Sequence, residues 1–144
     1  MNENMKFDVV ASYTRKEAIS DGFQVRIEDK IRSEAGIKYP VFVTRTVWDR
    51  YLKVPTGLEG HQDMEGRIWD MLYMFVQNAK RNGFASKFKY RVLFQMNRNT
   101  LWDKNERRVN DNPELREVIL IAEVGATDID DPAPAITIST SQDD

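Results

Sequence analysis

The chain has no cysteine among its 144 residues and only one histidine, His61. The lack of cysteine excludes disulfides, thiolate metal sites and cysteine nucleophiles. A single histidine excludes paired-histidine metal motifs, and no serine lies in the nucleophile-elbow motif that a Ser-His-Asp triad often uses. The seven glycines are scattered, so the sequence has no glycine-rich phosphate loop. These absences argue against catalysis by cysteine, by a paired-histidine metal site or at a glycine-rich phosphate loop, and nothing in the sequence calls for a metal ion or a cofactor.

Long hydrophobic runs are also missing. No segment approaches the ~18 consecutive apolar residues of a membrane span, and Met1 to Lys6 lack the apolar stretch of a signal peptide. We therefore expect a cytoplasmic protein without a membrane partner. What is present suits one folded domain, because 41% of the residues are hydrophobic and the chain contains three Trp, five Tyr and seven Phe.

The clearest structural pattern runs from Asp63 to Met96. Apolar residues recur at helical spacing from Asp63 to Asn82, so that one narrow face of a helix is apolar. After Gly83, apolar and polar residues alternate from Lys87 to Met96, which is the period of a half-buried strand. The residues predicted to face inward on this strand are Phe88, Tyr90, Val92, Phe94 and Met96.

Shorter patterns complete the fold prediction. Thr14 and Glu17 form a capping box at a short helix, and residues 28–35 and 44–51 have the character of further short helices. Residues 23–27, 39–43 and 116–124 are predicted strands, the last of them continuously apolar and therefore expected in the middle of the sheet, covered on both faces. We predict an α+β domain, in which a small, mainly antiparallel sheet of three to five strands carries the Asp63 to Asn82 helix across one face.

The end of the chain differs in composition from the rest. Residues 123–144 contain six acids and no base, and residues 127–144 are rich in Pro, Ser, Thr and Asp. Such a composition is typical of a linker or tail, so we predict a domain over residues 1–126 and a flexible acidic tail over 127–144. Two alternatives stay open: Ile136 to Ser139 alternates and would fit an edge strand, or the tail folds back over the basic residues described next.

The basic residues are concentrated in one part of the chain. Residues 1–122 hold 21 bases against 17 acids, a net charge of about +4, and nine bases but only two acids lie between Lys80 and Arg108. Cations attract phosphate or acidic surfaces, and an exposed tryptophan offers a stacking surface. The alternative is a solvated outer face on an edge strand that lysines protect from aggregation. The predicted contact surface consists of Lys87, Lys89, Arg91, Arg98, Trp102, Arg107 and Arg108.

Three segments carry a resemblance to a known family. They are residues 13–22 (Y-T-R-x-x-A-I-x-D-G), 39–48 (Y-P-V-x-V-T-x-x-V-W) and 66–74 (G-R-x-W-D-M-L-x-M). In order and spacing they resemble an uncharacterised family of small proteins found on bacterial plasmids, integrative elements and phages. The resemblance implies a mobile-element gene and a cytoplasmic protein, and it implies no reaction. We expect Trp48 and Trp69 to pack together as core, with Arg67 and Asp70 at the rim in a position to bind a ligand.

Three functional hypotheses follow. The first is a non-enzymatic accessory protein of a phage or mobile element, which binds a protein or nucleic acid of the host or element and interferes with a defence or DNA-processing system. The second is a small enzyme acting on a nucleotide or nucleic acid, with Asp63, Glu65 or Asp70 as acid or base and Mg²⁺ held by one or two carboxylates and the substrate. The third is an oligomeric partner that uses Met74 on the polar side of the long helix. The sequence sets no oligomeric state.

Overall fold

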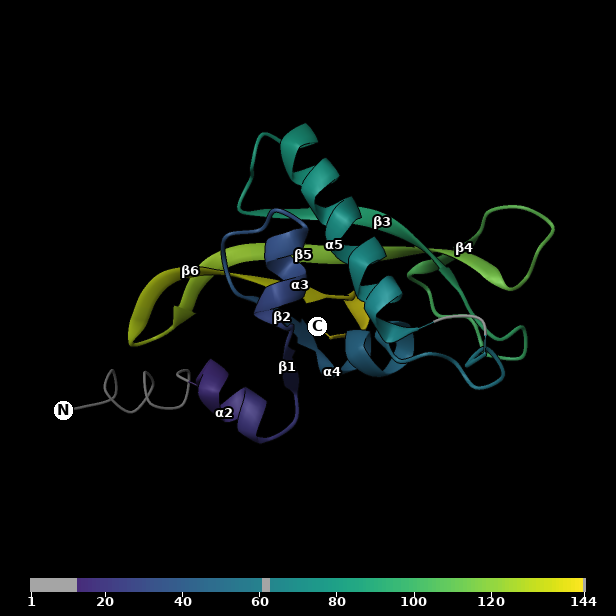
Figure 1. Cartoon of the computed structure of the whole chain (residues 1–144), viewed down its shortest axis with the longest axis horizontal. Helices are drawn as coiled ribbons and strands as arrows, with labels where there is room; N and C mark the ends of the chain where they lie inside the picture. The colour runs from purple at the N-terminus through teal and green to yellow at the C-terminus, as the bar shows by residue number, and fades with distance from the viewer. Residues whose placement is uncertain (1–12, 61–62, 144) are drawn as a thin grey trace.

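The computed structural model describes residues 13–60 and 63–143, and these form an α+β fold (Figure 1). A long helix, α5, lies across a twisted sheet, and the short helix α3 lies on the same face. In chain order the elements are α2 (Arg15–Ser20), β1 (Gln24–Arg26), α3 (Asp29–Glu34), β2 (Val41–Thr44), α4 (Arg45–Val47), the π-helical turn η1 (Trp48–Leu52), α5 (Met64–Arg81), β3 (Lys87–Gln95), β4 (Glu106–Arg108), β5 (Leu115–Asp128), β6 (Asp131–Ser139) and the 3₁₀ turn η2 (Ser141–Asp143).

The described residues contribute six strands to one sheet, with the order β1-β2-β6-β5-β3 and with β4 paired to β5 outside this path. All neighbouring strands are antiparallel except β2 and β6, which are parallel. The predicted α+β class and the mainly antiparallel sheet are therefore confirmed. The sheet is larger than the predicted three to five strands because β4 and β6 lie in segments whose composition is typical of loops.

Helix α5 forms where the periodicity predicted it. Asp63 caps its first turn, since its carboxylate accepts a hydrogen bond from the backbone N–H of Gly66 at 2.6 Å. At the other end Gly83 adopts a φ of +63°, a left-handed conformation that glycine reaches at little cost. The buried face of α5 packs on the inward side chains of β3, where each large apolar side chain contributes roughly 1.5–3 kcal/mol by its burial. On the helix these residues are Ile68, Met71, Leu72, Phe75 and Ala79.

Strands β3 and β5 pair antiparallel along the whole of β3, from Lys87 opposite Glu123 to Gln95 opposite Leu115. This confirms that the two segments are strands, and the register makes them neighbours in the sheet. The prediction that β5 is covered on both faces is wrong, because its burial alternates over its first half. Val118 is fully buried under α5, whereas Ile119 on the other face is half-buried.

The predicted boundary at residue 126 is also wrong. Strand β6 lies between β2 and β5 in the sheet, and its Ile136 and Ile138 belong to the core. The proline-rich composition predicted a tail, but Pro132 and Pro134 lie in the exposed half of β6, beyond the end of β2. There the strand has β5 as its neighbour on one side, and a proline without an N–H is tolerated at such an edge.

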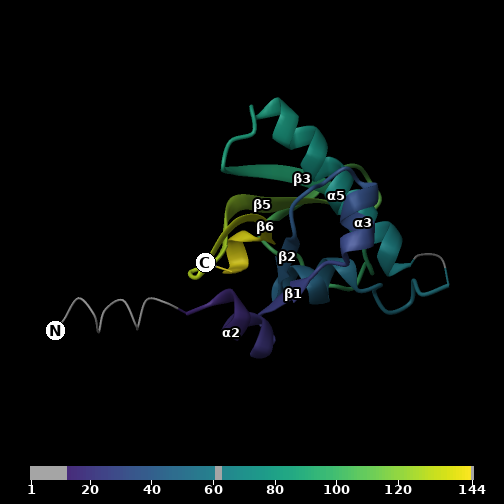
Figure 2. The ribbon, with the colours of Figure 1, turned by 60° about the vertical axis from the view of Figure 1, so that its left-hand side comes forward.

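The two faces of the sheet are covered unequally. On the face away from α5, the guanidinium of Arg15 lies 4.1 Å from the centre of the Phe42 ring and that of Arg26 lies 5.5 Å from it, which leaves Phe42 buried. Arg15 also donates hydrogen bonds to the carbonyl of Thr127 and the hydroxyl of Thr137. Figure 2 shows α2, which begins at Arg15, well away from α5. The β3 half of the same face is exposed.

Candidate functional site

The outward face of β3 carries a row of three cations. Lys87, Lys89 and Arg91 are exposed, and they alternate with buried side chains along the whole strand. The alternation is forced by the pleat, because the aromatic residues between them must point toward α5. Every second residue of a strand is about 6.6–6.8 Å further along it, so the row has a regular spacing on a rigid support.

Carboxylates and apolar side chains accompany this row on the neighbouring strand. The register places Glu123 opposite Lys87, Ile121 opposite Lys89 and Ile119 opposite Arg91. Residues directly opposite each other in a sheet point to the same face. Arg91 also forms an ion pair with Glu117 at 3.6 Å. The outward face is therefore a mixed surface with an excess of positive charge.

Strand β4 divides the remaining members of the predicted surface. Arg107 is opposite Glu117 and so shares the face of the β3 cations, whereas Arg108 is opposite Arg116 and belongs to the other face. Both side chains are exposed, as is Arg98 in the turn that follows β3. Of the seven predicted contact residues, the register therefore brings four to one face: Lys87, Lys89, Arg91 and Arg107.

Trp102 has a structural contact that the sequence did not reveal. The guanidinium of Arg116, which is fully buried, lies 3.9 Å from the centre of the Trp102 ring. The Nε–H of Arg116 has no hydrogen-bond acceptor among the described residues, so the indole face is its main contact on that side. Trp102 is 41% exposed. One face of the ring shields a buried charge, and the remainder is available to a partner.

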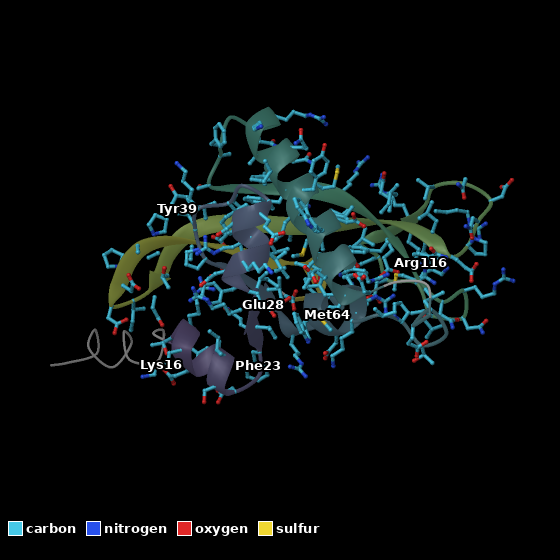
Figure 3. All side chains as sticks on the ribbon, in the orientation of Figure 1. Lys16, Phe23, Glu28, Tyr39, Met64 and Arg116 are labelled. Carbon is cyan, nitrogen blue, oxygen red and sulfur yellow. The ribbon has the colours of Figure 1, made fainter. Side chains whose placement is uncertain are left out.

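Beneath Trp102 lies a buried ionic cluster centred on Glu106. Its carboxylate accepts hydrogen bonds from Arg50 at 2.6 Å, from Arg116 at 2.8 Å and from the hydroxyl of Tyr51. Burial alone would raise the pKa of Glu106, but these donors and the backbone N–H of Asp103 hold it below its usual value. The cluster ties the 97–105 connection and β4 to the core. Figure 3 places Arg116 toward one end of the sheet.

Arg67 and Asp70, expected together at a rim, have different environments. Arg67 is buried, so its expected rim position is wrong: its guanidinium donates to the carbonyls of Tyr51 at 2.6 Å and Gln95 at 2.8 Å. Burial lowers the pKa of Arg67 to about 10, with Asp70 acting in the opposite direction. Asp70 is exposed, and desolvation raises its pKa against the effect of Arg67.

Trp48 and Trp69, which lie in the segments that carry the family resemblance, are both partly exposed. Trp48 is half-buried and packs against the core cluster, and Trp69 is half-buried on α5. Neither belongs to the buried core, so their expected position there is wrong. Trp48 begins the π-helical turn η1, whose buried members are Tyr51 and Leu52. The core position at this end of the sheet is taken by Tyr51, whose ring stacks on Phe94 at 5.4 Å.

Of the three carboxylates considered for catalysis, one caps a helix and the other two are exposed. Asp63 caps α5, and Glu65 is exposed in the first turn of that helix. Asp63, Arg67 and Asp70 line a hollow of about 460 Å³ between α5 and the end of β3. Within residues 13–60 and 63–143 there is no group of three His, Asp or Glu side chains placed to hold a metal ion. His61 lies outside the described residues.

Comparison with known proteins gives a family. No curated protein and no solved structure matches the chain significantly. Across the two described ranges, no helix combines the length and apolar character needed to cross a bilayer. A family model described as a family of unknown function (DUF6573) matches residues 1–144. Because this match covers the whole sequence, the chain belongs to the family of unknown function DUF6573.

Proposed function

We propose that the chain is a non-enzymatic binding protein that contacts a macromolecule through the outward face of β3. The contact surface consists of Lys87, Lys89 and Arg91, with Arg107 of β4 on the same face. The observation that carries the proposal is the row of exposed cations, held at regular spacing by a strand whose other face is locked into the core. The backbone under such a surface is ordered before binding, so little backbone entropy is lost when a partner docks.

The composition of this face favours an acidic protein surface as the partner. Glu117 and Glu123 lie among the four cations, and Ile119 is partly accessible between them. A phosphate backbone would be repelled by the two carboxylates, whereas a protein surface can place a cation opposite each of them. The net charge of −2 for the whole chain also departs from the basic profile of nucleic-acid-binding domains.

The biological setting comes from the resemblance to mobile-element proteins. We propose that the chain is an accessory protein of a phage or mobile element in the host cytoplasm, and that its partner belongs to a defence or DNA-processing system. The absence of cysteine and the single histidine in the sequence suit a role without catalysis.

The test compares acidic probes and charge-reversed variants. Binding of poly-L-glutamate and of single- and double-stranded DNA oligonucleotides is measured by fluorescence anisotropy at low and at physiological salt. The test variant is Lys87→Glu/Lys89→Glu/Arg91→Glu, and the control variant, Lys16→Glu/Lys30→Glu/Arg81→Glu, changes the net charge equally at exposed positions elsewhere. We expect the test variant to lose about tenfold or more in affinity for poly-L-glutamate, and the control to change by about twofold or less.

Two outcomes would change the proposal. Equal losses in the two variants would show that net charge, and not the β3 face, governs binding. Tighter binding of DNA than of poly-L-glutamate, with a steep salt dependence that the test variant loses, would make the partner a nucleic acid. In that case the surface would stand and the chemistry of the partner would be corrected.

A second candidate function, a carboxylate-dependent enzyme acting on a nucleotide, is supported by Asp70. This residue lines the hollow with Arg67, and its raised pKa would suit a general acid or base. A thermal-shift screen with nucleotides and Mg²⁺ tests it, since a bound ligand raises the melting temperature by mass action. A rise that Asp70→Asn abolishes would favour the enzyme, and no rise with any nucleotide would eliminate it.

A further inference from the structure

We infer that the chain has a second binding site, an apolar groove at the other end of the sheet that takes a short acidic segment of a partner protein through large apolar side chains. The groove lies between the C-terminal half of α5, the connection from α3 to β2, and the strands β3, β5 and β6. Its volume is about 540 Å³, within the usual range of roughly 300–1,000 Å³ for ligand sites. The floor is formed by Phe75, Phe88 and Ile136, all members of the hydrophobic core.

Two large exposed side chains form walls above this floor. Tyr39 is 44% exposed and Phe84 is 74% exposed, and both line the groove. Figure 3 shows Tyr39 at the end of the molecule away from Arg116, so the groove and the buried ionic cluster are separate. Single exposed apolar residues are ordinary, but here the exposed side chains continue an apolar surface that reaches into the core.

The backbone of Phe84 strengthens this interpretation. Phe84 has a φ of +59°, and it is the only non-glycine residue with positive φ in the described part of the chain. Its N–H donates to the carbonyl of Ala79 at 2.8 Å, a helix-ending bond that glycine would make without strain. A phenylalanine is thus kept in an unfavourable conformation with most of its ring in water. Neither helix termination nor burial accounts for it, whereas contact with a partner does.

The charges at the groove define the partner. Of the described residues that line it, Lys38 and Lys80 are charged and none is an acid. Both lysines are exposed, and neither takes part in any ion pair described for the chain. Lys80 is also favoured at its position by the dipole of α5, but Lys38 lies outside any helix. An occupant with carboxylates beside its apolar side chains would pair with both.

The openness of the groove favours a protein segment over a small amphipathic acid. Sites for small ligands enclose about 70–90% of the ligand surface, whereas Tyr39 and Phe84 leave this groove open to solvent along its walls. A segment of a folded partner brings further surface that covers these walls. Because the groove lies on the α5 side of the sheet and the cations of β3 lie on the opposite face, the inference does not depend on the proposed function.

The experiment selects ligands and then tests the groove with matched variants. Short random peptides displayed on phage are selected against the full-length chain, and the peptides recovered are measured by fluorescence anisotropy. We expect sequences that combine aromatic or large aliphatic residues with Asp or Glu. Phe84→Gly should weaken the binding of these peptides by about tenfold or more, as expected for an aromatic anchor. Because glycine relieves the positive φ, this variant should keep or raise the melting temperature, so that lost binding cannot be ascribed to unfolding.

The charge arm uses Lys38→Glu/Lys80→Glu against Lys16→Glu/Lys30→Glu, which changes the net charge by the same amount away from the groove. The first double variant should lose about tenfold or more in affinity for the selected peptides, and the second should lose about twofold or less. Lys87→Glu/Lys89→Glu/Arg91→Glu should bind the peptides normally, which separates this site from the β3 face. These results together would establish the groove as a site for acidic, apolar segments.

The inference is overturned by any of four results. The selection yields no enriched sequences, or yields sequences without acids or without large apolar residues. Phe84→Gly binds the peptides as well as the wild type. Dodecanoate occupies the groove, as seen by changes in the NMR signals of Ser86 and Val124, while no peptide does. Sedimentation shows a dimer that Phe84→Gly dissociates, which would make a second copy of the chain the occupant.

Discussion

Two arginine–glutamate pairs of this molecule include a residue of β5, and they lie in opposite environments. Arg116 and Glu106 are 2.8 Å apart, with both side chains fully buried. Arg91 and Glu117 are 3.6 Å apart, with side chains 57% and 24% exposed. The same chemistry therefore serves two purposes. The buried pair holds β4 against β5, and the exposed pair leaves its charges accessible to another molecule.

The difference follows from desolvation. Removing two charges from water costs several kcal/mol for each, and a buried pair is tolerated only when further hydrogen bonds satisfy it. Glu106 meets this condition through Arg50, Tyr51 and the backbone N–H of Asp103. Arg91 and Glu117 stay hydrated, so their attraction is screened and worth at most about 1 kcal/mol. A partner can replace that attraction at little cost.

The largest expected effect on the stability of the fold is therefore at the buried pair. Glu106→Gln keeps the shape of the side chain but leaves the guanidinium groups of Arg50 and Arg116 without their shared counter-charge. We expect the free energy of unfolding to fall by about 3–5 kcal/mol, measured by urea denaturation. A loss below about 1 kcal/mol, the range of an exposed pair, would show that the cluster is solvated and would remove the contrast between the two pairs.

The buried pair should also contribute to the pH dependence of stability. The folded-state pKa of Glu106 lies below its ordinary value of 4.5. Its stabilising contribution is thus complete above that value, declines as the pH falls below it, and is lost once the pH is below the folded-state pKa. The melting temperature of Glu106→Gln should consequently fall less steeply on acidification than that of the wild type. Parallel curves for the two proteins would contradict this assignment.

A smaller effect is expected at the ring that covers the buried pair. Trp102→Ala exposes the guanidinium of Arg116 to water and removes a desolvated cation–π contact. The expected loss is about 1–2 kcal/mol in the free energy of unfolding. Trp102→Phe is the matched control, because it retains an aromatic face and should recover part of the loss. An unchanged stability for Trp102→Ala would mean that the ring is a surface residue without a structural role.

The smallest effect on stability is expected at the exposed pair. Glu117→Gln should change the free energy of unfolding by less than about 1 kcal/mol. Because this change removes an acid from among the cations of β3, affinity for poly-L-glutamate should rise, by about two- to fivefold on the scale of one exposed pair. A decrease would show that Glu117 itself contacts the probe, and the positive character of the surface would need revision.

The comparison also shows which features could be predicted from the sequence. The exposure of Lys87 and Lys89 follows from strict alternation with aromatic residues, a local signal that the sequence contains in full. Helix α5 was predictable for the same reason, since its apolar periodicity and the residues that begin and end it lie within one segment. Predictions of this kind depend on residues close together in the chain, and the structure confirms them.

The features that were missed depend on distant residues. Glu106 lies in a polar connection, and nothing nearby indicates that Arg50, 56 residues away in sequence, and Arg116 enclose it. Arg67 was expected at a rim, yet backbone carbonyls from two other elements accept its hydrogen bonds inside the protein. The place of β6 between β2 and β5 is likewise set by pairing with strands distant in sequence. The prolines and acids of this segment predicted a tail instead of a strand.

The most direct test of the account is site-specific photo-crosslinking in cells that carry the gene. A photoreactive amino acid replaces Lys89 on the outward face of β3 in one variant and Lys30 on α3 in the other, both at exposed positions. We predict a discrete crosslinked protein adduct from position 89 and none from position 30. Adducts from position 30 alone, or no adduct from position 89, would contradict the assignment of the β3 face as the binding surface.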